Sequence, residues 1–313
     1  MSDRAELRLV GPGGEPVDLA RTLASHGFAD LPPLRLDEAA NTLELTFPLS
    51  RGAWTVRVSL GRRGYAAIEP LGKPLGRDRD RVLAVVAHVL RLDEDLSPFY
   101  ELAAADPALD WVTSGAGRML RSPTVFEDVV KTICTTNCAW SGTLRMVGAL
   151  VEYLGPEDRA AGRHAFPTPE AMAEADESFY RDVARAGYRG AYLRTLAASV
   201  ADGSLDLEEL AASNSPDLPD DEVVERLLAL PGVGPYAAAH IMMLLGRYSR
   251  LIFDSWTRPT YAEVTGARKR VADRTIERRF RRYGRYAGLA FWLVLTRSWV
   301  GEEGLAARAS APG

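Results

Sequence analysis

The sequence predicts an α+β fold that is mostly helical, with a small antiparallel sheet at the N-terminus and a helical body after it. Between Leu43 and Leu71, apolar and polar residues alternate around glycine-containing breaks near residues 52 and 61–64, a pattern typical of short antiparallel strands. After residue 80, apolar residues recur at helical spacing in segments that proline or glycine interrupts. The composition agrees, because 47% hydrophobic and 26% charged residues are typical of a globular protein.

Each further element follows from a local pattern. A short helix is expected over 17–26, before the sheet, and the apolar spacing after Arg77 predicts another. Ser97 before Pro98 suits the start of a third helix, because proline is favoured in the first turn. Later helices are expected over 123–139, 142–154, 168–176, 178–186, 190–202, 206–213, 221–229, 235–245, 256–264, 271–283 and 286–299, which leaves no strand after residue 80.

We expect three structural units along the 313 residues. An N-terminal β-sheet domain would span 1–80, and a helical domain 81–220. A last unit over 221–313 would hold the final helices and pack against the preceding ones.

Charge and cysteine content exclude several classes of protein. Subtracting 42 Asp and Glu from 38 Lys and Arg gives a net charge of −4, so any contact with nucleic acid must be local. Cys134 and Cys138 are too few for a disulfide scaffold or a four-thiolate iron–sulfur cluster, and we expect both to pack. No signal-peptide pattern and no apolar stretch of about 18 residues is present, so we expect a cytoplasmic protein that does not enter a membrane.

The most informative stretch runs from Val223 to Tyr261. Its pattern predicts a helix, a tight turn with the sequence LPGVG at 230–234, and a second helix. The two glycines would let the main chain approach another surface, and the amides at the start of the second helix favour an anion such as a DNA phosphate. An ordinary connection between two helices explains the same turn equally well.

Asp254 follows Gly234 by twenty residues and comes directly after an apolar Leu-Ile-Phe run. Aspartate is a favoured helix cap, worth ~1 kcal/mol, and a cap can also be a catalyst. With this hairpin and this spacing, the sequence resembles the helix-hairpin-helix (HhH-GPD) DNA glycosylase superfamily. The resemblance covers about residues 80–300, and the sheet is similar in placement to the N-terminal domain of the 3-methyladenine DNA glycosylase II and 8-oxoguanine DNA glycosylase branches.

The resemblance implies a two-lobed helical glycosylase body and an enzyme of base excision repair. Such an enzyme flips a damaged nucleotide out of duplex DNA and hydrolyses its N-glycosidic bond. Asp254 would be the catalytic carboxylate, stabilising positive charge on the sugar and orienting the attacking water. The expected partner is double-stranded DNA containing a damaged base, and we expect the protein to act as a monomer.

The resemblance also implies how the hairpin would bind. Amides in the turn, contributed by Gly232, Val233, Gly234 and Tyr236, would hold a DNA phosphate. Carbonyls of Leu228, Leu230 and Val233 would hold a monovalent cation. No cofactor is expected to be required, and no iron–sulfur cluster is expected.

Tyr236 stands where the bifunctional branches of the family keep a lysine. A phenol cannot form an imine with the sugar, and the only lysines are Lys73, Lys131 and Lys269, none at the matching position. We therefore expect a monofunctional glycosylase. Two alternatives stay open: a bifunctional 8-oxoguanine-type glycosylase and lyase that uses another amine, and a non-catalytic lesion-sensing module.

Asn137 matches the position at which the 8-oxoguanine branch inserts an asparagine opposite the orphaned base. Its amide can both donate and accept hydrogen bonds, although a helix-terminal cap explains it as well. Trp140-Ser141-Gly142 departs from that branch, which puts a preference for 8-oxoguanine in doubt.

Aromatic residues that could line a base pocket are Phe126, Trp140, Tyr236 and Trp256, each of which could equally belong to the core. Such rings favour an electron-poor alkylated purine slightly over an oxidised one. Arg258 could neutralise a phosphate or restrain Asp254. The basic run 267–288 could meet phosphates or form a solvated, internally paired face.

Overall fold

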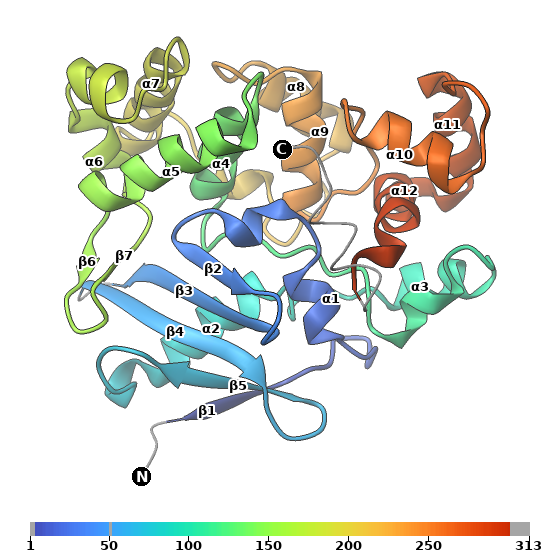
Figure 1. The fold of residues 1–313 in the computed structure, drawn as a ribbon, viewed down its shortest axis with the longest axis horizontal. Helices are drawn as coiled ribbons and strands as arrows, with labels where there is room; N and C mark the ends of the chain where they lie inside the picture. Colours follow the sequence, from blue (N-terminus) through green and yellow to red (C-terminus); the bar gives the residue numbers. More distant parts are fainter. Residues whose placement is uncertain (1–3, 50–51, 301–313) are drawn as a thin grey trace.

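The N-terminal sheet has five antiparallel strands in the order β1-β5-β4-β3-β2 (Figure 1). The structure is a computed structural model that describes residues 4–49 and 52–300. Thr46 and Thr55 face each other across β3 and β4, with their hydroxyl oxygens 3.2 Å apart. The alternating segments of the sequence are β3, β4 and β5, whereas the two short outer strands were not expected. The strands are β1 (Ala5–Arg8), β2 (Leu34–Asp37), β3 (Thr42–Leu49), β4 (Gly52–Leu60) and β5 (Tyr65–Pro70).

Two helices complete the core of the sheet. Leu19 and Leu23 of α1 (Leu19–Leu23) and Val82 and Val86 of α2 (Arg79–Val89) are buried in the same hydrophobic cluster as the strands. Burial of these apolar faces fixes both helices against the sheet. The division of the chain at residues 80 and 220 stays a prediction.

The rest of the chain is mainly helical. Its helices are α3 (Ser97–Ala104), α4 (Val125–Thr135), α5 (Trp140–Leu154), α6 (Pro169–Glu174), α7 (Arg189–Ala201), α8 (Asp220–Leu228), α9 (Pro235–Leu244), α10 (Thr257–Val264), α11 (Asp273–Phe280) and α12 (Ala287–Thr296). Short 3-10 turns lie at Gly27–Asp30, Gly76–Asp78, Asp110–Ser114, Glu208–Leu210, Arg281–Tyr286 and Arg297–Trp299.

Three expectations about these elements were wrong. Two-residue strands, β6 (Glu157–Asp158) and β7 (Arg163–His164), pair within the helical region. The helix expected over 178–186 is a single π-helical turn, Phe179–Val183, because Arg185 adopts a left-handed φ of 51°. The helix expected over 206–213 is one 3-10 turn, in which the Leu210 carbonyl accepts a hydrogen bond from Arg247 at 2.9 Å.

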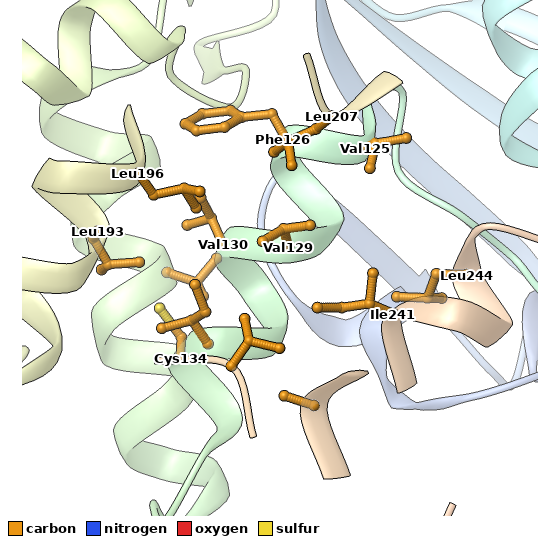
Figure 2. Close-up of a cluster of buried hydrophobic side chains, with 14 of the residues drawn as sticks. Val125, Phe126, Val129, Val130, Cys134, Leu193, Leu196, Leu207, Ile241 and Leu244 are labelled. Atoms are coloured by element: carbon orange, nitrogen blue, oxygen red, sulfur yellow. The ribbon is translucent and has the colours of Figure 1, made fainter. Parts of the chain in front are cut away.

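Helix α9 joins two hydrophobic clusters and thereby two lobes of the helical body. Ile241 and Leu244 pack in the first cluster, with α4 lying between them and α7 (Figure 2). Ala239 and Met243 belong to the second cluster, which contains α3, α11 and α12. A helix that is apolar on all sides must be buried on all sides, and α9 meets this condition by packing between the lobes.

Arg91 fixes the far end of α9. This side chain is 1% exposed, and its guanidinium donates hydrogen bonds to the main-chain carbonyls of Leu244 and, at 2.7 Å, Met119. A cation is favoured at a helix C-terminus, where carbonyls lack partners. The opposite end of α9 is therefore the end open to a ligand.

None of the helices in the described part of the chain has the length and apolar character needed to cross a membrane.

Two glycines provide a matched test of this packing. The Gly288 amide donates to the Tyr248 carbonyl at 2.6 Å, and a Cβ at residue 288 would lie 2.0 Å from the Arg250 carbonyl oxygen. We expect Gly288→Ala to lower the free energy of unfolding by about 1–3 kcal/mol, because the segment leading to Asp254 must move. The control is Gly148→Ala, where an added Cβ meets nothing within 4 Å in a helix interior. The free energy of unfolding of Gly148→Ala, measured by chemical denaturation, should rise by about 0.5–1 kcal/mol. Equal effects of the two substitutions would contradict the packing described.

Candidate active site

The hairpin connects α8 to α9 through the turn 229–234. Gly232 has a φ of +81°, and a Cβ added there would lie 2.8 Å from a ring carbon of Tyr192. Gly234 has a φ of −102°, and an added Cβ would meet nothing within 4 Å. The fold therefore requires glycine at 232, whereas Gly234 leaves a bare surface that another molecule can approach.

Main-chain amides at the start of α9 are free to bind an anion. In the part of the chain that the structure describes, three of these amides donate to no main-chain carbonyl: Gly234, Tyr236 and Ala237. Pro235, the first helical residue, has no amide hydrogen. With the positive end of the helix dipole behind them, these amides suit a phosphate.

The carbonyls of the same turn have the chemistry of a cation site. Those of Leu228 and Val233 accept no main-chain hydrogen bond within the described ranges, and that of Leu230 accepts one, from the Val233 amide at 3.2 Å. Carbonyl oxygens are hard ligands that suit a monovalent cation. The donor set therefore fits, and the cation site stays a prediction.

Asp254 precedes α10, and that helix holds one of its two carboxylate oxygens. Oδ1 accepts hydrogen bonds from the amides of Trp256, at 2.8 Å, and Thr257, at 2.6 Å. The Thr257 hydroxyl accepts one from the Asp254 amide at 2.9 Å. Oδ2 accepts none from any residue that the structure describes. Capping therefore occupies one oxygen and leaves the other available for chemistry.

Tyr236 and His240 lie within electrostatic range of Asp254. They are one turn apart on α9, with ring centroids separated by 6.1 Å. Burial raises the pKa of Tyr236, the charge of Asp254 raises it further, and a hydrogen bond with Thr135 opposes both. Burial lowers the pKa of His240 to about 4, although Asp254 opposes this shift. The structure thus brings together a carboxylate, a neutral phenol and a neutral imidazole.

Besides Tyr236, His240 has aromatic neighbours from the part of the chain that precedes the sheet strand β2. Its ring lies 4.8 Å from that of Phe28 and 6.2 Å from that of His26, measured between centroids. Its Nε2 is buried and has no hydrogen-bond partner among residues 4–49 and 52–300. Trp140 meets the same 3-10 turn, since a Cβ added at Gly27 would lie 3.4 Å from its ring. The segment 26–28 therefore lies beside α9, which no local pattern could have revealed.

Two of the predicted pocket aromatics pack against other aromatic rings. Phe126 is 4% exposed and packs in the hydrophobic core with its ring 6.3 Å from that of Phe166 (Figure 2), and its place in a base pocket stays a prediction. Trp256 packs its ring against those of Trp292 and Trp299, at centroid distances of 5.5 and 5.3 Å. Tyr236, Trp140 and Trp256 are half-buried and stay candidates for a pocket.

Asn137 is exposed in the loop between α4 and α5, and it adopts a left-handed φ of 46° that asparagine tolerates. Arg189, which the sequence did not single out, is 7% exposed and donates to the carbonyls of Thr136 and, at 3.0 Å, Asn137. The Arg189 guanidinium also stacks 4.6 Å from the ring centroid of Tyr188, an exposed residue beside this loop. A buried cation therefore fixes the backbone of the loop while the Asn137 side chain stays at the surface.

Arg258 bonds to the main chain of Asp254 and not to its carboxylate, and a role at a phosphate stays a prediction. It makes a two-pronged ion pair with Asp273, at 3.0 and 2.9 Å, and also donates to the main-chain carbonyl of Asp254 at 3.0 Å. Its charge is thus already satisfied by a carboxylate other than the candidate catalyst.

Cys134 is buried in the first cluster, and Cys138 is half-buried. Within the described ranges, no group of three or more histidine, cysteine, aspartate or glutamate side chains is placed to hold a metal ion.

Comparison with known sequences finds a distant relative. No protein-family model matches the chain. The DNA-3-methyladenine glycosylase of Bacillus subtilis (strain 168) is 26% identical over 176 residues, which cover 54% of this chain and 56% of the relative. The match thus spans little more than half of the relative's length.

Comparison with solved structures covers nearly the whole chain. MBOgg1 in complex with a low-affinity DNA ligand matches with a TM-score of 0.71 and 18% identity, over 94% of this chain and 95% of that one. The 3-methyladenine DNA glycosylase from Archaeoglobus fulgidus matches with a TM-score of 0.69 and 19% identity, over 93% of this chain and 97% of that one. The Clostridium acetobutylicum 8-oxoguanine glycosylase/lyase in its apo form matches with a TM-score of 0.66 and 20% identity, over 94% of this chain and 96% of that one.

The chain therefore has the fold of the helix-hairpin-helix DNA glycosylases, and the resemblance seen in the sequence is confirmed.

The buried histidines predict a dependence of stability on pH. Burial lowers the pKa of His240 to about 4 and that of His26 to about 3, whereas both return to about 6.5 on unfolding. The unfolded chain then binds more protons between these values, so the free energy of unfolding falls as the pH drops from 7 to 5, by about 2 kcal/mol per histidine. His240→Gln should reduce this fall in denaturant titrations. An unchanged pH difference in this variant would contradict the burial of His240.

Proposed function

We propose that the protein is a monofunctional DNA glycosylase that hydrolyses the N-glycosidic bond of a damaged purine, with alkylated bases preferred over oxidised ones. The observation that carries this proposal is the Asp254 carboxylate. Its Oδ1 is held by two amides while its Oδ2 is unbonded among the described residues, next to the helix that begins at the hairpin. A carboxylate fixed in this way needs no reorganisation when charge develops nearby.

The chemical step uses that fixed charge. As the bond between the sugar and the base breaks, the sugar becomes cationic, and Asp254 stabilises this positive charge more strongly than it does the neutral substrate. The same carboxylate orients the water that attacks the anomeric carbon. Because the charge interacts with Tyr236 and His240, a base stacked on these rings would have its sugar near Asp254.

Two features of the rings support a preference for alkylated purines. A base such as 3-methyladenine carries positive charge in its nucleoside, and the face of Tyr236 can attract it. His240, with its pKa lowered to about 4, is neutral at pH 7 and would not repel a cationic base. The Bacillus subtilis relative is named for 3-methyladenine, although the solved neighbours include proteins named for both lesions.

The positions of the lysines support hydrolysis without strand cleavage. Lys131 is fully buried and paired with Glu127 at 2.6 Å, and the amine of Lys73 lies 4.3 Å from the ring centroid of Trp54 in the sheet domain. Lys269 is exposed in the segment between α10 and α11, and no contact of its amine with Asp254 is found in the described part of the chain. An imine needs a primary amine within reach of the anomeric carbon.

The partner is duplex DNA that contains the lesion. Amides of the hairpin would hold a phosphate, which positions the enzyme without reading sequence. Asn137 would enter the duplex from a loop whose backbone Arg189 fixes. A monovalent cation held by the carbonyls of Leu228, Leu230 and Val233 would add positive charge beside that phosphate. The main-chain amides of the hairpin would bind the DNA with or without this cation.

Asp254 provides the direct test. In Asp254→Asn the side-chain oxygen can still accept the amides of Trp256 and Thr257, so the fold should be kept while the charge is lost. We expect base release in single turnover to fall by about 10²–10³-fold, with binding to undamaged duplex within a few-fold of the wild type. Asp254→Ala, the companion variant, should lose activity and also about 1 kcal/mol of stability from the missing cap. Near wild-type base release by Asp254→Asn would refute the assignment.

The monofunctional proposal predicts abasic sites without nicks. After incubation with a lesion duplex, half of each sample is heated in alkali and half is left untreated. Strand breaks should appear only in the alkali-treated half, because no amine forms an imine with the sugar. Nicking in the untreated half, together with a borohydride-trapped adduct that is lost in Lys269→Arg, would establish lyase chemistry instead.

A further inference from the structure

The segment 267–288 concentrates positive charge in an otherwise acidic protein. It contains nine basic residues (Arg268, Lys269, Arg270, Arg274, Arg278, Arg279, Arg281, Arg282 and Arg285) and two acidic ones (Asp273 and Glu277). Nine minus two gives +7, so the remainder of the chain carries −4 − 7 = −11. The net charge of this segment is therefore opposite in sign to that of the rest of the chain.

Three arginines of this segment form an exposed surface, which we call the arginine face: Arg274, Arg278 and Arg281. The side chain of each makes no ion pair or hydrogen bond with any residue in the ranges 4–49 and 52–300. Other cations of the segment do have partners, since Arg282 pairs with Asp106 and Arg279 donates to the Tyr261 hydroxyl at 3.2 Å. The side chains of the arginine face are thus not part of a network of internal ion pairs.

Packing fixes the direction in which this face points. Ile276 and Phe280, on the other side of α11, are buried in the second hydrophobic cluster. Spacings of four and three residues place Arg274, Arg278 and Arg281 together on the solvent side. Of the two acids in the segment, Asp273 is occupied by Arg258, and Glu277 makes no ion pair with any residue that the structure describes.

An unpaired group of like charges opposes folding unless an anion neutralises it. Arg274 and Arg278 are one turn apart on the helix, where like charges repel. Figure 1 shows α11 beyond α10, toward the same upper edge of the view as α8 and the connection between α4 and α5. A ligand that occupies the hairpin and extends along this edge as a polyanion would reach α11.

We propose that the arginine face binds phosphates of the duplex that flanks the lesion, on the side of the site beyond α10. It would enlarge the contact with DNA and its non-specific affinity without taking part in base release. This proposal rests on the proposed function in one respect: the DNA held at the hairpin must run along the edge that leads to α11. Its test therefore uses undamaged duplexes, so that a failure of base release and a failure of this surface are separate results.

The test compares three variants that carry the same number of substitutions. R274Q/R278Q/R281Q removes the arginine face, and R274K/R278K/R281K keeps its charge. R63Q/R77Q/R79Q removes three exposed arginines near the sheet that make no ion pair within the described ranges. Affinity for duplexes of about one and about three helical turns is measured over a range of salt concentrations.

For R274Q/R278Q/R281Q we expect weaker binding, with a larger loss on the long duplex than on the short one. The slope of log affinity against log salt should fall by up to about 3, at roughly 0.9 for each phosphate that the protein no longer neutralises. The lysine variant and the sheet-domain variant should keep the wild-type slope, and base release by saturating enzyme should be unchanged in all three. Wild-type affinity in R274Q/R278Q/R281Q would overturn the proposal and leave another acidic partner as the ligand. Equal losses on both duplexes, or the same loss in the sheet-domain variant, would also overturn it.

Discussion

The burial of α9 between two hydrophobic clusters is the constraint on which the rest of the structure depends. Ile241 and Leu244 fix it to one lobe, and Ala239 and Met243 fix it to the other. Rotation of the helix would expose apolar area on both sides, at a cost of about 25 cal/mol per Å². Because Arg91 occupies the C-terminal end, the N-terminal end of α9 is left to the hairpin amides, which we propose hold a phosphate. The packing of the core thus sets the orientation of the candidate site.

Asp254 shows how a structural role and the proposed catalytic role can coexist in one side chain. The hydrogen bonds that cap α10 are made by Oδ1 alone, and they fix the position of Oδ2. Arg258, the cation one helical turn further along the chain, is held by Asp273 and contacts only the main-chain carbonyl of Asp254. The cap therefore contributes to preorganisation, since the charge is in place before the reaction begins.

Sequence patterns predicted the parts of the fold that local chemistry determines. The three longer strands follow from alternation, and the hairpin and Asp254 follow from glycine, proline and capping preferences. Strands β6 and β7 were missed because two residues carry no periodicity and depend on pairing with each other. Phe126 and Tyr236 are both aromatic residues near helix starts, and only the packing of α4 shows that the first is in the core. His240 and Arg189 were missed because their partners, Phe28 and the carbonyls of 136–137, are distant in the sequence.

The central claim is that a fixed carboxylate beside the buried helix α9 releases a flipped, damaged base. The most direct measurement is base release by the wild-type protein from a panel of duplexes that carry 3-methyladenine, hypoxanthine, 8-oxoguanine or uracil. We expect release of the alkylated purine at a higher single-turnover rate than 8-oxoguanine or uracil. Failure to release any base of the panel, by a protein that still binds duplex DNA, would contradict this claim.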